Sequence, residues 1–158
     1  MKMKVIFSEN IGKALYNKNI TQNELARDSN LTRQTVNKAM GLSINEKEDI
    51  SLETALAISR GLNVNFSDLF SRNFDPEKVL SYKKDDYLMI FTENVRRSIK
   101  NKNQKFLSTR PGIHESTISD ILNGKVQNPK LSSLIIIATI LEQDLGELFI
   151  RGDENNDF

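Results

Sequence analysis

Apolar residues recur at intervals of three and four positions along much of this 158-residue chain. Examples are Ile11 and Ala14 near the start, and Ile118, Ile121 and Leu122 in the second half. On a helix with about 3.6 residues per turn, this spacing places apolar side chains on one face and leaves the other face polar. The pattern therefore predicts short amphipathic helices and an all-α fold.

The chain contains a long internal repeat. The stretch IFSENI at 6–11 returns as IFTENV at 90–95, and NKN at 17–19 returns at 101–103. The first copy carries extra residues near 44–49, where a loop is expected and where insertions are tolerated. A repeat of this length predicts two small domains of the same fold.

The most informative stretch runs from 22 to 40 and returns at 104–122. In both copies a short amphipathic segment leads into a tight turn, and a second short helix follows. The turn needs one residue that can adopt a positive φ, and Gly112 and Asn30 both fit because Gly does so freely and Asn tolerates it. Two short helices around such a turn describe a helix-turn-helix unit.

Each copy resembles the helix-turn-helix of the Cro/CI repressor family, the lambda-repressor-like DNA-binding domains. The shared pattern is Gln, two residues, Leu-Ala, a few residues, Gly-Val/Ile, Ser/Thr and then a helix. The second copy reads GIHESTISDILNGK, which is close to the commonest form. The copies depart from the pattern at Asn30 in place of Gly, at Ser108 in place of Ala, and at Pro111 before the turn.

The resemblance implies two tandem five-helix lambda-repressor-like domains joined by a short, partly helical linker. Pro76 suits the first turn of a short linker helix that would run to Tyr82. The acidic end of the chain is expected to be disordered. The predicted limits are 1–72 for the first domain, 73–87 for the linker, 88–151 for the second domain and 152–158 for the tail.

Several polar residues stand where helix ends are expected. Ser8, Thr32 and Ser51 are predicted N-caps, because a hydroxyl can accept a backbone N–H of the first helical turn. Asn63 is expected to end the fourth helix, where the family usually has Gly. The fifth helices are expected to start with capping-box-like pairs, which are Asn65 with Asp68 and Asp144 with Glu147.

By the family resemblance, the second helix of the first unit would enter the major groove of DNA with its N-terminal residues first. Arg reads guanine through two hydrogen bonds, Gln and Asn read adenine likewise, and Thr packs on a thymine methyl group. A helix N-terminus also favours a phosphate. Taken singly, each such residue could be an ordinary solvated side chain, but together they favour DNA reading. The expected base contacts are Arg33, Gln34, Thr35, Asn37 and Lys38, and the expected phosphate contacts are Gln22 and Thr32.

The matching helix of the second copy has the opposite charge. It carries Glu115 and Asp120, hence −2, where the first carries Arg33 and Lys38, hence +2. Such a face is unfavourable beside phosphates, although carboxylates can accept from cytosine and basic residues surround the helix. The alternative is a duplicated module that lost its site and serves assembly. The second-copy DNA candidates are Gln104, His114, Glu115, Ser116, Thr117, Ser119 and Lys125.

Composition narrows the possible chemistry. The chain has no Cys, one His and a net charge of +1, so it offers no thiolate metal site. His114 has no partner residues for a metal site or a catalytic triad, and no apolar run approaches the ~18 residues of a membrane span. The N-terminus does not resemble a signal peptide. The sequence therefore predicts a cytoplasmic protein that is not an enzyme, has no cofactor or metal, and does not enter a membrane.

The run LIIIATIL at 134–141 is apolar almost all round, so it is expected to be buried on two sides. One side would be its own core. The other would be the first domain or a second chain, which makes a homodimer through Leu134–Leu141 possible. A uniformly apolar helix with no second contact is the alternative.

The predicted function is a sequence-specific transcriptional regulator, of repressor type, that binds double-stranded DNA. The alternative is a protein-binding module on the same fold, such as an antitoxin or a phage-encoded inhibitor. In that case the anionic face of the second copy would bind a basic partner protein.

Overall fold

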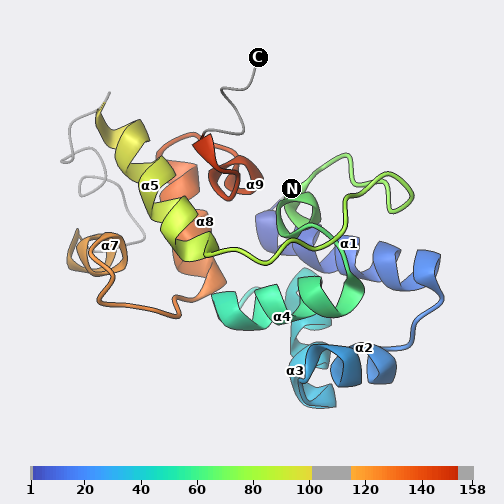
Figure 1. The fold of residues 1–158 in the computed structure, drawn as a ribbon. Coiled ribbons are helices and arrows are strands. Elements are labelled where there is room, and N and C mark those ends of the chain that lie inside the picture. The colour runs from blue at the N-terminus through green and yellow to red at the C-terminus, as the bar shows by residue number, and fades with distance from the viewer. Residues whose placement is uncertain (1, 101–114, 153–158) are drawn as a thin grey trace. The chain divides into compact units, whose positions relative to one another are not determined.

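The computed structural model of the chain describes residues 2–100 and 115–152. Helices form the regular structure of these residues, apart from one isolated antiparallel bridge between Ser51 and Lys130, and the all-α prediction is confirmed. The segment 101–114, which includes the predicted second helix and turn of the second copy, lies outside the described residues. The elements are α1 Met3–Lys18, α2 Gln22–Ser29, α3 Arg33–Met40, η1 Gly41–Ser43, α4 Leu52–Leu62, η2 Phe66–Phe70, α5 Tyr87–Lys100, α7 Glu115–Leu122, α8 Leu131–Ile140 and α9 Leu145–Leu148 (Figure 1).

The chain divides into two compact units, which agrees with the internal repeat. The first comprises residues 1–84 with 130–132, and the second comprises residues 85–129 with 133–158. Residues 130–132 belong to the first unit because of backbone contacts. The Leu131 N–H, for example, donates to the Ile50 carbonyl at 2.8 Å. The domain limits drawn from the sequence stay predictions.

The two cores are built on the same aromatic pair. In the first unit Phe7 of α1 stacks on Phe70 with ring centroids 5.0 Å apart. In the second unit the repeat-equivalent Phe91 of α5 contacts Phe149 at 5.5 Å. All four side chains are buried. Each pair therefore fastens the first helix of its unit to the segment that ends the unit.

Three of the predicted helix ends of the first unit are confirmed. The Thr32 hydroxyl accepts the Thr35 N–H at 3.1 Å, and the Ser51 hydroxyl accepts the Thr54 N–H at 3.2 Å. Asn63 ends α4 in the left-handed region, with φ of 53°. Each of these side chains or backbone turns satisfies groups that the helix itself leaves unpaired.

The prediction that Ser8 caps the first helix is wrong. Helix α1 begins at Met3, and Ser8 is buried in its middle. Ile6 and Phe7 are buried too, so the apolar face that draws α1 onto the core extends further toward the N-terminus than the polar Ser-Glu-Asn stretch suggested. The Ser8 hydroxyl instead donates to the carbonyl of Met40 at 2.8 Å.

The fifth helices differ from each other. In the first unit the element is a short 3₁₀ helix, η2, and Asn65 makes no side-chain cap there, so the predicted Asn65–Asp68 pair is wrong. The Asp68 carboxylate accepts the N–H of Leu80 at 3.1 Å instead. In the second unit the predicted cap is confirmed, because Asp144 accepts the Glu147 N–H at 3.3 Å.

The predicted linker helix from Pro76 to Tyr82 is absent, and a turn occupies 76–78. Asp75 closes this turn by accepting the Glu77 N–H at 3.1 Å. The residues that follow are hydrogen-bonded to the end of α4 and to the residue before η2. The Leu80 carbonyl accepts the Asn65 N–H at 2.7 Å, and the Tyr82 N–H donates to Asn63 Oδ1 at 3.2 Å. A helix over 76–82 would use the N–H groups of Leu80 and Tyr82 for its own i to i−4 bonds, but Leu80 donates to Asp68 and Tyr82 donates to Asn63, so these contacts compete with it.

Candidate nucleic-acid interface

The helix-turn-helix of the first unit consists of α2, the turn at 30–32 and α3 (Figure 1). A capping box opens α2, in which Thr21 Oγ1 accepts the Glu24 N–H at 3.1 Å and Glu24 Oε1 accepts the Thr21 N–H at 3.3 Å. Asn30 then takes φ of 57°, as predicted, and reverses the chain. These local features set the start and the end of α2 and the turn into α3.

Helix α3 separates a buried face from a polar face. Val36 and Ala39 are fully buried, so the opposite face of the helix is exposed to solvent. Thr35 and Gln22 are half-buried. The remaining predicted contact residues of the first unit are exposed to solvent: Thr32, Arg33, Gln34, Asn37 and Lys38.

Two hydrogen bonds restrict the side chains at the start of α3. Arg33 Nη1 donates to Asn23 Oδ1 of α2 at 2.5 Å. The Oγ1 atoms of Thr32 and Thr35 lie 2.8 Å apart, so one hydroxyl donates to the other. The sequence analysis missed Asn23, because a polar residue in the first turn of a surface helix carries no signal that it contacts another helix.

The far end of α3 is fastened to the core of the unit. The Met40 carbonyl accepts hydrogen bonds from Ser8 at 2.8 Å and from Ser43 at 3.3 Å. Helix α2 is held in turn by α4, because Arg60 Nη2 donates to the Ser29 carbonyl at 3.2 Å. The exposed face of α3 is therefore presented by a rigid support rather than by a loop.

The extra residues of the first copy are bound to the start of α1. Lys4 Nζ donates to the Glu48 carbonyl at 2.8 Å, and Lys2 pairs with the Glu46 carboxylate at 2.6 Å. The hydrogen bond and the charge of Lys2 lower the pKa of the Glu46 carboxyl below its ordinary value. These cations are engaged within the unit, whereas the described residues provide no ion pair for Lys38.

In the second unit the matching helix α7 is also held by contacts within the unit. Ile118 and Ile121 are buried, and the Ser119 hydroxyl accepts Asn123 Nδ2 at 3.1 Å. Arg96 donates to the carbonyl of Leu122 at 2.5 Å, which is the repeat equivalent of the Met40 carbonyl. Arg96 therefore caps α7 from the position that Gly12 occupies in α1.

The other second-copy candidates divide by exposure. Ser116 and Lys125 are exposed, and Thr117 and Ser119 are half-buried. Gln104 and His114 lie outside the described residues, as does the side chain of Glu115. The structure thus places part of the candidate face on α7, which lacks the two cations and two amides of α3.

Helix α8 contains the apolar run. Leu134 and Ile137 are fully buried, whereas Ile135 and Ile136 are half-buried and Thr139 is exposed. A homodimer through this helix stays a prediction.

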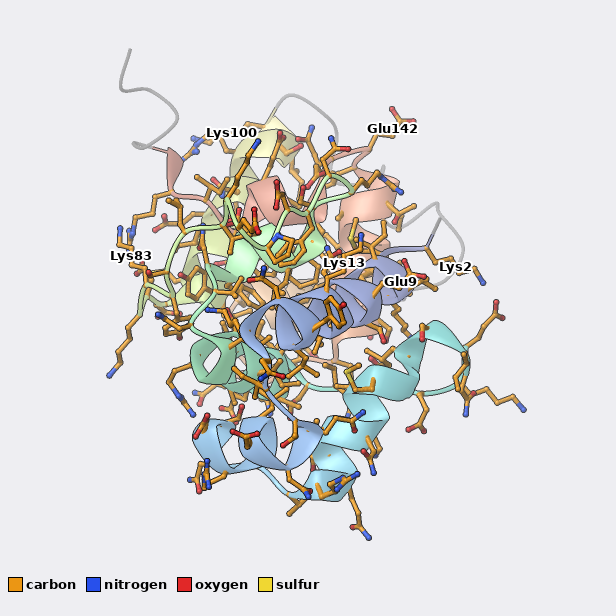
Figure 2. All side chains as sticks on the ribbon, turned by 90° about the vertical axis from the view of Figure 1, so that its right-hand side faces the viewer. Lys2, Glu9, Lys13, Lys83, Lys100 and Glu142 are labelled. Atoms are coloured by element: carbon orange, nitrogen blue, oxygen red, sulfur yellow. The ribbon has the colours of Figure 1, made fainter. Side chains whose placement is uncertain are left out.

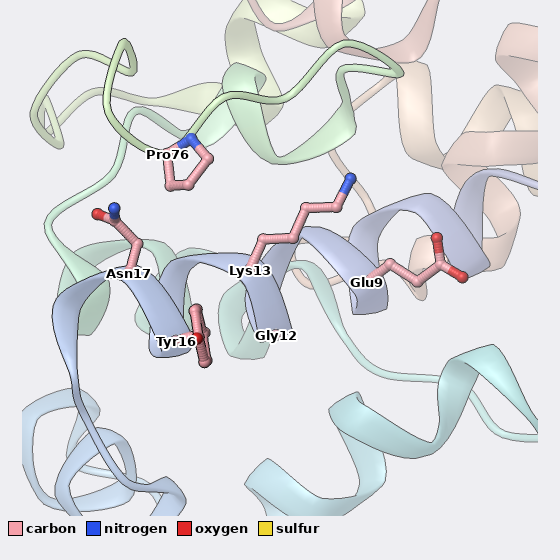
Figure 3. A pocket seen from close by; sticks show the side chains of 6 residues that line it. All are labelled: Glu9, Gly12, Lys13, Tyr16, Asn17 and Pro76. Atoms are coloured by element: carbon pink, nitrogen blue, oxygen red, sulfur yellow. The ribbon is translucent and has the colours of Figure 1, made fainter.

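A shallow hollow of about 670 Å³ lies along α1. Lys13 and Glu9 of α1 and Pro76 of the connecting segment border it (Figure 3). Its lining mixes charged, amide and apolar groups. Among the described residues no cluster of His, Cys, Asp or Glu could hold a metal ion, and no helix is long and apolar enough to cross a membrane.

Comparison with known proteins identifies both halves of the chain. A family model described as a Cro/C1-type HTH DNA-binding domain matches residues 10–75 and, a second time, residues 95–154. No curated protein and no solved structure gave a match.

Proposed function

Because this chain belongs to the Cro/C1-type helix-turn-helix DNA-binding family, we propose that it is a transcriptional regulator that recognises a specific sequence in double-stranded DNA. The first unit would read bases in the major groove through α3. The regulator would act as a repressor, by occupying a site that transcription requires. Its DNA target implies a cytoplasmic location.

The outward face of α3 is the observation that carries the proposal. It presents Arg33, Gln34, Asn37 and Lys38 to solvent from a helix whose rear is fixed by buried apolar residues. Arg and Lys are the usual partners of guanine, and Gln and Asn are the usual partners of adenine. Two cations and two amides on one helix suit base reading, and no free energy is spent on ordering the helix when it binds.

The backbone of the duplex would be bound beside this face. Gln22 opens α2 and Thr32 caps α3, so both lie at helix N-termini. A helix N-terminus carries a partial positive charge and free N–H groups, which favour a phosphate. These contacts would fix the register of α3 in the groove without selecting a base.

The role of the second unit has two versions. In one, α7 and the turn after it contact the same duplex through Ser116, Thr117 and Lys125, with Gln104, His114, Glu115 and Ser119 as further contacts. In the other, α7 binds a basic partner protein. The charge of α7 favours the second version for this unit, because it carries Glu115 and Asp120 and a doubly anionic helix is unfavourable beside phosphates.

A salt series on the wild-type chain tests the proposal. A duplex would first be selected from a random pool, and its affinity compared with that of an unrelated duplex at about 50 and 200 mM salt. DNA affinity falls steeply with salt, with a log–log slope near −0.9 for each neutralised phosphate. We expect a preference for the selected duplex and a slope of several units. The absence of duplex binding at low salt would instead favour the protein-binding alternative.

A further inference from the structure

Asn23 and Arg33 join the two helices of the helix-turn-helix through their side chains. Asn23 lies in the first turn of α2, and Arg33 is the first residue of α3. Arg33 Nη1 donates to Asn23 Oδ1 at 2.5 Å, although both side chains are exposed. An exposed hydrogen bond of this kind contributes little to the free energy of folding. Because it lies next to the expected base contacts, we consider a role in DNA recognition instead.

The geometry leaves Arg33 competent to bind a base. A guanidinium has five N–H donors, and two parallel ones suffice for guanine, so one bond to Asn23 does not exhaust it. The amide of Asn23 is uncharged and does not neutralise the cation. A free Arg side chain samples many rotamers, and a bond that restricts them before binding removes part of the entropic cost of the base contact.

Asn23 itself is held independently of this bond. The capping box that fixes the start of α2 uses Thr21 and Glu24, so the side chain of Asn23 has no part in it. Loss of the Asn23 amide would therefore leave the helix intact.

We infer that Asn23 is a positioning residue, which holds the Arg33 guanidinium in place and thereby sharpens the preference for guanine at one position of the DNA site. This inference rests on the proposed function of α3. Asn23 need not touch the DNA; it acts through Arg33.

The test compares wild-type protein, Asn23→Ala, Asn23→Asp and Arg33→Ala on the selected duplex. The guanine to be varied is the one whose preference disappears in Arg33→Ala. We expect Asn23→Ala to reduce discrimination at this base by about three- to tenfold, the factor expected when one long side chain is no longer ordered in advance. Binding to the unrelated duplex should stay unchanged.

Asn23→Asp distinguishes positioning from contact. An aspartate keeps an oxygen acceptor for Arg33 but adds a negative charge, so it should retain more guanine discrimination than Asn23→Ala while it weakens binding to every duplex. In an Arg33→Ala background, Asn23→Ala should change nothing further at that base. Circular dichroism should show equal helix content for all variants.

Two results would overturn the inference while the proposed function stands. One is unchanged guanine discrimination in Asn23→Ala. The other is an equal loss of affinity for selected and unrelated duplexes, which would make Asn23 a phosphate contact. If the wild-type chain bound no duplex at all, the proposed function would fail first, and the inference with it.

Discussion

Asn10 and Asn94 make the same pair of hydrogen bonds in the two units. Asn10 Nδ2 donates to the carbonyls of Leu69 at 3.0 Å and Ser71 at 2.8 Å. Asn94 Nδ2 donates to the carbonyls of Leu148 and Ile150, at 2.8 Å each. One amide thus closes each unit by joining its first helix to its last turn. The repeat seen in the sequence is therefore also a repeat of one polar contact.

Asn10→Ala should destabilise the first unit by about 2–3 kcal/mol, because it leaves two carbonyl groups without their donor. Asn10 is buried, whereas Asn94 is half-buried, so Asn94→Ala should cost less since water can replace the amide. Urea unfolding of the two variants measures the difference. Equal and small effects would show that these bonds do not close the units.

Gly61→Ala should destabilise the first unit although alanine favours helices. A Cβ at Gly61 would lie 2.1 Å from Ser29 Oγ and 3.1 Å from Ser29 Cβ, because α2 packs closely on α4. Such overpacking typically costs about 1–3 kcal/mol, against a helix-propensity gain of about 1 kcal/mol. Gly41→Ala is the matched control, since no atom lies within 4 Å of a Cβ at that position. Thermal unfolding should separate the two variants, and an equally stable Gly61→Ala would contradict this packing.

The Thr35 hydroxyl is bonded to Thr32, so under the proposed function we expect Thr35 to contact DNA through its methyl group. Thr35→Ser removes the methyl group and should lower the preference for thymine, while Thr35→Val keeps a methyl group and should retain it. Burial of one methyl group is worth about 0.8 kcal/mol, so the expected change is about fourfold. Competition between duplexes that differ in one thymine measures it. The opposite order of the two variants would assign the reading to the hydroxyl.

The helices, the repeat and the turn residues could be predicted from the sequence because their signals are local. The apolar spacing, Asn30 at the turn and Thr32 at the start of α3 all act within a few residues of themselves. Ser8 was misassigned for the opposite reason: its hydroxyl bonds to Met40, on another helix. No pattern of neighbouring residues encodes such a contact.

The same distinction applies to the connecting segment and to the candidate site. Pro76 suits a helix start. However, the Leu80 carbonyl accepts the Asn65 N–H, and the Leu80 N–H donates to the Asp68 carboxylate; both partners lie earlier in the chain. The polar face of α3 could be predicted from the order of its residues. The bond from Arg33 to Asn23 could not, since it depends on how α2 and α3 pack.

The most direct test of the account replaces two residues of the reading face and two of a face that the account leaves free of DNA. Arg33→Ala with Gln34→Ala removes one cation and one amide from α3. Lys13→Ala with Asn17→Ala removes the same chemistry from the exposed side of α1, where Lys13 projects from the helix (Figure 2). Both pairs are exposed, so both double variants should fold.

The measurement is the affinity of each double variant for the selected duplex and for an unrelated one. We predict that the affinity of the α3 variant for the selected duplex falls about 100-fold or more, because each bidentate contact to a base is worth roughly 1–3 kcal/mol. The α1 variant should bind both duplexes like wild type. Wild-type affinity in the α3 variant, or an equal loss in both variants, would contradict the assignment of α3 as the helix that reads DNA.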